Sequence, residues 1–156
     1  MAQSCQAEER AKAARVPVIY CNDNFGDWRS DFKAVLTACT REDKPARDLV
    51  QSIAPGPGDY FILKPKHSAF YETTLDLLLR YLGAKTLIFT GIAGNICILF
   101  SANDAYMRDF NLLIPSDCVV SNTPEENEHA FEQMRSVLKA DTRRSDAIDF
   151  SETVRW

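Results

Sequence analysis

The sequence predicts an α/β protein with a doubly wound, mostly parallel sheet, a Rossmann-like arrangement of three layers. Short apolar runs alternate with helical patterns along the whole chain of 156 residues. The apolar runs are continuous, which is typical of parallel strands that are covered on both faces. No repeat, linker or low-complexity segment interrupts this order, so we expect a single domain over residues 1–156.

Four apolar runs are predicted to be the strands of this sheet. They are VPVIYC at 16–21, YFILK at 60–64, TLIFTGI at 86–92 and NLLIP at 111–115. Because helical patterns lie between them, the crossovers should be right-handed. Ligands in such folds bind beyond the carboxyl ends of the strands.

Two predicted helices have clear signals at their ends. The first begins at Thr73, has Asp76 at capping-box spacing and ends at Gly83, a good C-terminal stop. The second begins with Thr123 as N-cap, and Glu126 completes its capping box. Their apolar faces are formed by Leu75, Leu78, Leu79 and Leu82 in the first helix, and by Ala130, Phe131, Met134, Val137 and Leu138 in the second.

Other segments have helical spacing with weaker boundaries. One follows Gly94 and Asn95 and extends to Tyr106, and two further candidates are residues 27–38 and 45–53. Residues 7–15 are typical of the second half of an amphipathic helix, yet no strand pattern precedes them. We therefore expect the chain to begin in the middle of a unit, and the domain to be truncated at its N-terminus.

The composition excludes several classes of partner. The net charge is −4 and the basic residues are scattered, so no nucleic-acid or anionic membrane surface is expected. No apolar run reaches the roughly 18 residues of a membrane span, and no secretory signal opens the chain, which favours a cytoplasmic protein. The five cysteines lack a CxxC pair and the two histidines are far apart, so we expect no metal and no cofactor.

The stretch GIAGNIC, residues 91–97, places Cys97 in the first turn of a helix after a buried strand. Unpaired N–H groups and the helix dipole favour a thiolate there, although a buried structural cysteine is the alternative. Lys64 ends another strand and should project from the same sheet edge, unless it is an ordinary solvated lysine. Lys66 competes for this position, because residues two apart on a strand share a face.

These segments resemble the isochorismatase-like cysteine hydrolases, which include nicotinamidases, N-carbamoyl amidases and ureido-amide hydrolases. The resemblance runs from AKAARVPVIYCNDNFGDW through the segment around Lys64 and Cys97 to LLIPSDCVVS. It implies that Cys97 is the nucleophile and Lys64 the active-site lysine. It also implies a cis peptide between Ile92 and Ala93, which would aim the N–H groups of Ala93 and Cys97 at an oxyanion.

The function that this resemblance implies is hydrolysis of a small amide or ureide. Cys97 would attack the carbonyl, an amine or ammonia would leave, and water would hydrolyse the thioester. Two alternatives remain open. One is a catalytically inactive member that serves as a binding or assembly subunit, with a homo-oligomer expected. The other is a thiol-redox sensor that uses Cys97 alone.

The sequence departs from the family pattern at its beginning. The family has a catalytic aspartate at the end of a first strand, in a stretch resembling DMQNDF, and that central strand is missing here. The strands at 16–21 and 86–92 would flank it, so either they pair directly or the natural protein starts upstream. Asp23 is the one carboxylate placed to serve as a surrogate base, although NDN is also a common turn that caps its own backbone.

The remaining expectations concern the substrate pocket. Many relatives carry threonine at the position of Gly94, and the glycine of this chain should loosen the turn. CNDNFGDW offers no histidine for the metal that the nicotinamidase branch holds, so nicotinamide is disfavoured as substrate. His67 is either a substrate contact or a solvated loop residue. The residues expected to bind substrate, with ordinary packing as the alternative for the aromatic ones, are Asn24, Phe25, Trp28, Phe70 and Tyr71.

Overall fold

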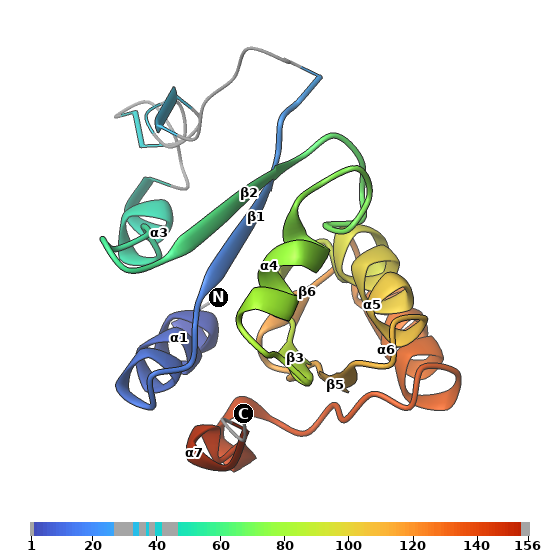
Figure 1. The fold of residues 1–156 in the computed structure, drawn as a ribbon. Coiled ribbons are helices and arrows are strands. Elements are labelled where there is room, and N and C mark those ends of the chain that lie inside the picture. The colour runs from blue at the N-terminus through green and yellow to red at the C-terminus, as the bar shows by residue number, and fades with distance from the viewer. Residues whose placement is uncertain (1, 27–32, 35–36, 38–39, 42–46, 154–156) are drawn as a thin grey trace.

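A computed structural model describes residues 2–26, 33–34, 37, 40–41 and 47–153. The predicted helix at 27–38 falls mostly outside these residues. In chain order the elements are α1 (Ala2–Ala13), β1 (Ile19–Asp23), α3 (Arg47–Ser52), β2 (Tyr60–Lys64), α4 (Leu75–Tyr81), β3 (Thr86–Ile88), β4 (Gly91–Ile92), a π-helical turn (Gly94–Ile98), α5 (Leu99–Tyr106), β5 (Asn111–Leu113), β6 (Val119–Val120), α6 (Pro124–Ser136), a 3₁₀ turn (Ser145–Ala147) and α7 (Phe150–Thr153) (Figure 1).

The described strands form three parallel pairs, β1 with β2, β3 with β5 and β4 with β6. Helices alternate with these strands along the chain, so the prediction of a Rossmann-like α/β fold is confirmed. β2 has the predicted bounds. β1 begins at Ile19, later than predicted, because its ladder partner begins only at Tyr60.

The prediction of one strand over residues 86–92 is wrong. The segment divides into β3 and β4, which belong to different pairs. Gly91 opens β4 with φ +118°, a conformation that residues with a side chain rarely adopt, and its N–H donates to the carbonyl of Cys118 at 2.9 Å. The partner of β4 is β6, a two-residue strand that is too short to show any periodicity in the sequence.

The edges of β1 and β3 that face away from their partners are not joined to each other. The backbone of Asn24 faces β2, because its N–H donates to the carbonyl of Lys64 at 3.0 Å. The backbone groups of successive residues in a parallel strand point to opposite sides, so those of Cys21 and Asp23 face away from β2. By the same alternation, Ile88 faces away from β5. No ladder joins β1 to β3 in the described part of the chain, so the direct pairing that the sequence allowed for these strands is wrong.

A cavity of about 460 Å³ lies between β1 and β3, and we call it the interstrand cavity. Figure 1 shows the β1–β2 pair standing apart from the β3–β5 pair, with α4 beside the space between them. The lining includes residues from both strands, from β2 and from the π-helical turn. Among them are Ile19, Cys21, Lys64, Ile88 and Cys97.

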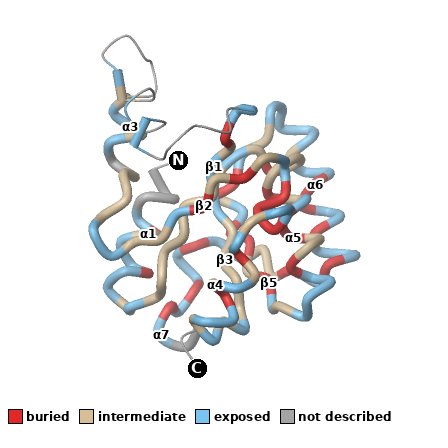
Figure 2. The backbone as a smooth tube through the Cα atoms, turned by 45° about the horizontal axis from the view of Figure 1, so that its top comes forward, coloured by how far each residue is buried: buried red, intermediate tan, exposed pale blue. Residues whose placement is uncertain are grey.

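The main core lies between the strands and the helices α4, α5 and α6. Figure 2 shows buried segments along α5 and α6, whereas the α3 residues whose burial is described are exposed or intermediate. Val137, predicted on the apolar face of α6, is 55% exposed, whereas its neighbour Leu138 is buried. The core includes Leu75 and Leu79 of α4, Ala102 and Ala105 of α5, and Ala130, Phe131 and Met134 of α6.

The two predicted capping boxes have different outcomes. At α6 the box is confirmed, since Thr123 Oγ1 accepts from Glu126 N at 3.2 Å and Glu126 Oε2 accepts from Thr123 N at 3.1 Å. At α4 it is wrong, because that helix begins at Leu75. Thr73 Oγ1 instead accepts from Leu75 N at 3.2 Å, and Asp76 pairs with Arg80.

A second cluster of buried residues ties the N-terminal helix to the C-terminal segment. Arg10 of α1 donates to the carbonyls of Ser145 and Ile148 at 2.7 and 2.6 Å, and its guanidinium lies 4.9 Å from the ring centroid of Phe150. No helix in the described part of the chain is long and apolar enough to cross a membrane.

Asp117, just before β6, should stabilise the protein in a pH-dependent way. Its carboxylate accepts from Ser145 N and Oγ, both at 2.8 Å, and lies 3.6 Å from Arg144. Burial alone would raise the pKa of this carboxyl, but the bonds from Ser145 and the charge of Arg144 outweigh burial and lower the pKa. The stabilisation is therefore present above the unfolded pKa of about 3.9 and is lost as the pH falls through the folded value.

We expect Asp117→Asn to lower the free energy of unfolding by about 1–3 kcal/mol at neutral pH. The difference from the wild type should shrink below pH ~4, where the wild-type carboxyl itself becomes protonated. Urea unfolding at neutral pH and below pH ~4 measures this difference in the free energy of unfolding. The control is Asp48→Asn, which replaces an exposed residue of α3. A penalty that is equal at the two pH values would contradict the assignment.

Candidate active site

Lys64 is the last residue of β2, and its side chain turns inward. The residue is only 3% exposed. Its ammonium donates to Asp23 Oδ1 at 2.6 Å, to the carbonyl of Lys66 at 3.2 Å and to Cys97 Sγ at 3.5 Å. All three N–H donors of the ammonium therefore have acceptors, which is what a buried lysine requires.

Cys97 reaches this ammonium from the π-helical turn Gly94–Ile98, which leads directly into α5. The turn follows Ala93, whose carbonyl accepts from the N–H groups of Ile96 and Ile98, both at 3.1 Å. Cys97 is partly buried and Ile98 behind it is packed into the core. The predicted proximity of a thiol and an ammonium at one sheet edge is thus present in the structure.

The peptide bond between Ile92 and Ala93 is cis, as the family resemblance implied. Ile92 pairs with Val120 in the β4–β6 ladder, and its side chain is 61% exposed. The role of this peptide in holding an oxyanion stays a prediction.

Gly94 opens the π-helical turn in a place where no side chain fits. A Cβ at this position would lie 2.7 Å from Val119 Cγ1, 2.8 Å from Ser121 Oγ and 2.9 Å from Asn127 Oδ1. The expectation that glycine loosens the turn is therefore wrong for this chain, because glycine lets the turn pack directly against β6 and α6. The same neighbours anchor the turn, since Asn95 N donates to Ser121 Oγ at 3.0 Å and Ser121 Oγ donates to Asn127 Oδ1 at 2.8 Å.

Gly94→Ala should displace the turn that carries Cys97 and destabilise the fold. Overpacking of this kind typically costs about 1–3 kcal/mol. We expect a lower urea midpoint together with slower alkylation of Cys97. Gly58→Ala is the matched control, because a Cβ there meets nothing within 4 Å. Equal behaviour of the two variants would contradict the close packing around Gly94.

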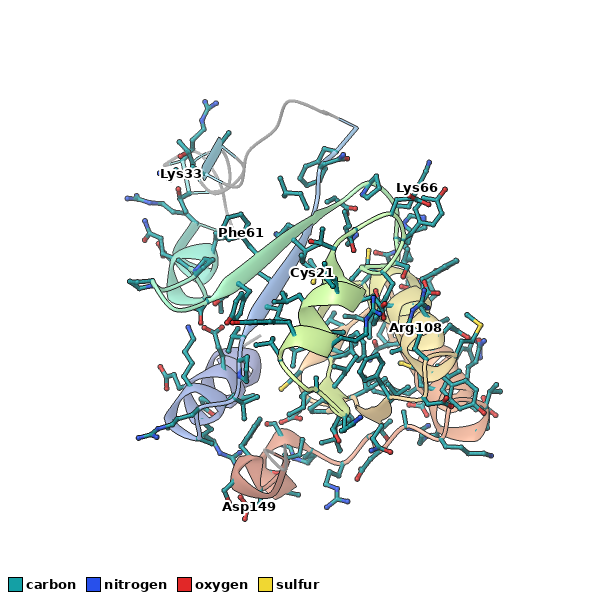
Figure 3. The ribbon with its side chains drawn as sticks, in the orientation of Figure 1. Cys21, Lys33, Phe61, Lys66, Arg108 and Asp149 are labelled. Carbon is teal, nitrogen blue, oxygen red and sulfur yellow. The ribbon has the colours of Figure 1, made fainter. Side chains whose placement is uncertain are left out.

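A second thiol, Cys21 of β1, lines the same interstrand cavity as Cys97. Burial raises the pKa of the Cys21 thiol to about 11, although the nearby Lys64 charge acts in the opposite direction. Figure 3 places Cys21 on β1, on the side of the strand pair that faces α4. Cys21 is consequently a thiol, and not a thiolate, at neutral pH.

Lys66 and His67 lie outside this cluster. Lys66 is exposed on the loop after β2, and Figure 3 shows its side chain pointing outward; only its carbonyl contacts Lys64. The structure thus separates the two lysines that the sequence could not. His67 is exposed, with its ring centroid 5.4 Å from that of Phe100.

The residues predicted to bind substrate are not gathered in one place. Asn24 is buried, and its Oδ1 accepts from Gly26 N at 2.9 Å. Phe70 is 5% exposed and packs against Phe110 in the core. Phe25 and Tyr71 are exposed, and neither lines the interstrand cavity. Trp28 lies outside the described residues.

The sequence analysis missed two residues that contact the π-helical turn carrying Cys97. Ser121 and Asn127 hold the turn from β6 and α6, and no spacing in the sequence connects them with Cys97. Within the described ranges no group of three or more His, Cys, Asp or Glu side chains is placed to hold a metal ion. The expected lack of a metal stays a prediction.

Comparison with protein families matches residues 1–144 to the family described as Isochorismatase domain. The chain is 48% identical over 141 residues to YaaI of Bacillus subtilis (strain 168), an uncharacterized isochorismatase family protein, covering 90% of this chain and 77% of YaaI. It is 44% identical over 69 residues to the ureidoacrylate amidohydrolase RutB of Methylorubrum extorquens, covering 44% of this chain but only 28% of RutB.

Solved structures share the fold. N-carbamoylsarcosine amidase from Thermoplasma acidophilum has a TM-score of 0.71 at 25% identity, covering 94% of this chain and 85% of that one. An isochorismatase family protein from Desulfovibrio vulgaris has a TM-score of 0.76 at 23% identity, covering 94% and 82%. The second likeness concerns the fold alone.

Proposed function

Because the chain belongs to the isochorismatase family of hydrolases, we propose that it cleaves the C–N bond of a small amide or ureide through Cys97. The observation that carries this proposal is the 3.5 Å contact between Cys97 Sγ and the buried ammonium of Lys64. A positive charge beside a sulfur favours the thiolate, and the thiolate is the nucleophilic form of cysteine.

The proposed reaction proceeds in two halves. Cys97 Sγ forms a bond to the carbonyl carbon, and the N–H groups of Ala93 and Cys97 receive the developing oxyanion. The C–N bond then breaks, the nitrogen takes a proton and leaves as ammonia or an amine, and a thioester remains. Water attacks the thioester carbon, the C–S bond breaks, and the acid leaves with Cys97 restored.

The relatives support a substrate of this class. RutB is a ureidoacrylate amidohydrolase and the Thermoplasma protein is an N-carbamoylsarcosine amidase, so both act on a C–N bond. The local match to RutB covers a minor part of that protein, so the substrate of this chain is proposed only at the level of amides and ureides.

Ammonia release tests the proposal directly. The purified chain is incubated with ureidoacrylate, N-carbamoylsarcosine and nicotinamide, beside the Cys97→Ser variant. We expect release from at least one ureide that depends on Cys97, and less from nicotinamide. Rapid alkylation of Cys97 without any hydrolysis would overturn the proposal in favour of a thiol sensor. Neither hydrolysis nor alkylation would favour the inactive binding subunit.

A further inference from the structure

We infer that Asp23 is the carboxylate partner of Lys64 and Cys97. It holds the Lys64 ammonium beside Cys97 and accepts the thiol proton through that ammonium. The inference rests on the proposed function and adds a residue to the same site. Asp23 acts through Lys64, so it is a positioning residue.

The ladder between β1 and β2 fixes the place of Asp23. It is the last residue of β1 and the register partner of Lys64. Register partners on adjacent strands direct their side chains to the same face of the sheet, so the carboxylate and the ammonium meet beyond the strand ends. Their 2.6 Å separation is short even for a charge-assisted hydrogen bond.

The charge of Lys64 requires such a partner. Its side chain is 4% exposed, and an ammonium removed from water without a counter-charge is strongly destabilising. Within the described part of the chain, Asp23 is the one carboxylate within 4.0 Å of Lys64 Nζ. The Asp23 side chain remains 39% exposed, which leaves it open to water on its other side.

The turn after β1 does not use Asp23. Asn24 Oδ1 accepts the N–H of Gly26, so Asn24 provides the side-chain cap that the NDN pattern predicted. The Asp23 carboxylate is thereby left to the ion pair.

The proton transfers balance over one turnover. Before the attack, the thiol proton moves to Lys64 Nζ while Nζ passes another to Asp23 Oδ1, which leaves a thiolate beside a charged lysine and a neutral carboxyl group. The reverse transfer delivers that proton to the departing nitrogen and restores the carboxylate. In the second half, a proton from the attacking water reaches the sulfur by the same route.

The test separates this role from a structural one. For the ureide that releases most ammonia, kcat and KM are measured for the wild type, Asp23→Asn, Asp23→Glu and the exposed control Asp48→Asn. Alkylation of Cys97 by iodoacetamide at pH 9 is followed in the same proteins. Alkylation of a preformed thiolate needs no proton acceptor, so it reports whether the site is intact.

We expect Asp23→Asn to lower kcat by about a hundredfold with KM changed less than about threefold. Alkylation of Cys97 should slow by a smaller factor than kcat, because the buried Lys64 ammonium loses its counter-charge. Asp23→Glu should recover part of kcat, and Asp48→Asn should match the wild type. An unchanged kcat in Asp23→Asn would overturn the inference, as would a parallel loss of alkylation, which indicates a structural role. A wild type that hydrolyses none of the substrates would instead overturn the proposed function.

Discussion

Replacing Cys97 with serine is expected to lower ammonia release by roughly a thousandfold or more. Sγ contacts the Lys64 ammonium, and in the proposed reaction it is the atom that attacks the carbonyl. A serine hydroxyl ionises far less readily than a thiol, and the site offers it no adjacent histidine as base. The measurement is kcat/KM for the ureide that releases most ammonia.

Selective alkylation provides the control for this prediction. At pH 8 iodoacetamide should label Cys97 and spare Cys21, because a pKa of about 11 leaves only about one part in a thousand of Cys21 as thiolate. The serine variant should keep the urea midpoint of the wild type. If it retained more than about a tenth of the activity, Cys97 would not be the nucleophile.

Lys64→Met should lower kcat/KM by about a hundredfold or more, because the ammonium is the positive charge that the structure places against the sulfur. Methionine has a similar length and suits the buried position, while the partly exposed Asp23 carboxylate can be hydrated. The fold should therefore persist. The pKa of Cys21 should rise further above 11, because the Lys64 charge acts to lower it.

Lys66→Met is the matched control, since the Lys66 side chain is exposed and only its backbone contacts Lys64. Activity and the pH dependence of Cys21 alkylation are measured for both variants. An active Lys64→Met protein, or equal losses in the two variants, would remove Lys64 from the site.

Much of the fold is evident from local patterns. The continuous apolar run at 60–64 matches β2, and the Thr123–Glu126 box marks the start of α6. These features depend on residues close in sequence, so they can be predicted without the rest of the chain. The strand predicted at 86–92 was wrong because β4 exists only through its pairing with β6, a contact that no local pattern encodes.

The candidate site also combines features that the sequence predicts with features that depend on the tertiary structure. Lys64 at the end of a strand and Cys97 in the helical turn that follows another strand can be placed from their apolar neighbours, and their chemistry points to a nucleophilic site. Phe70 illustrates the limit: its place in the chain suggested a pocket wall, but it packs against Phe110 in the core. An aromatic side chain is equally favourable in either environment, and only its neighbours decide between them.

The order of strands and helices, the caps and the reactive residue types are properties of short stretches of this chain, where nearby side chains and backbone propensities dominate the energy. The choice of Lys64 over Lys66, the pairing with Asp23 and the need for glycine at position 94 depend on contacts between residues that are far apart in sequence. Cys97 lies 33 residues from Lys64, Asp23 lies 41 from it, and Ser121 lies 26 from Asn95. Hydrogen bonds and steric contacts act over a few ångströms, so these choices are made only when folding brings the segments together.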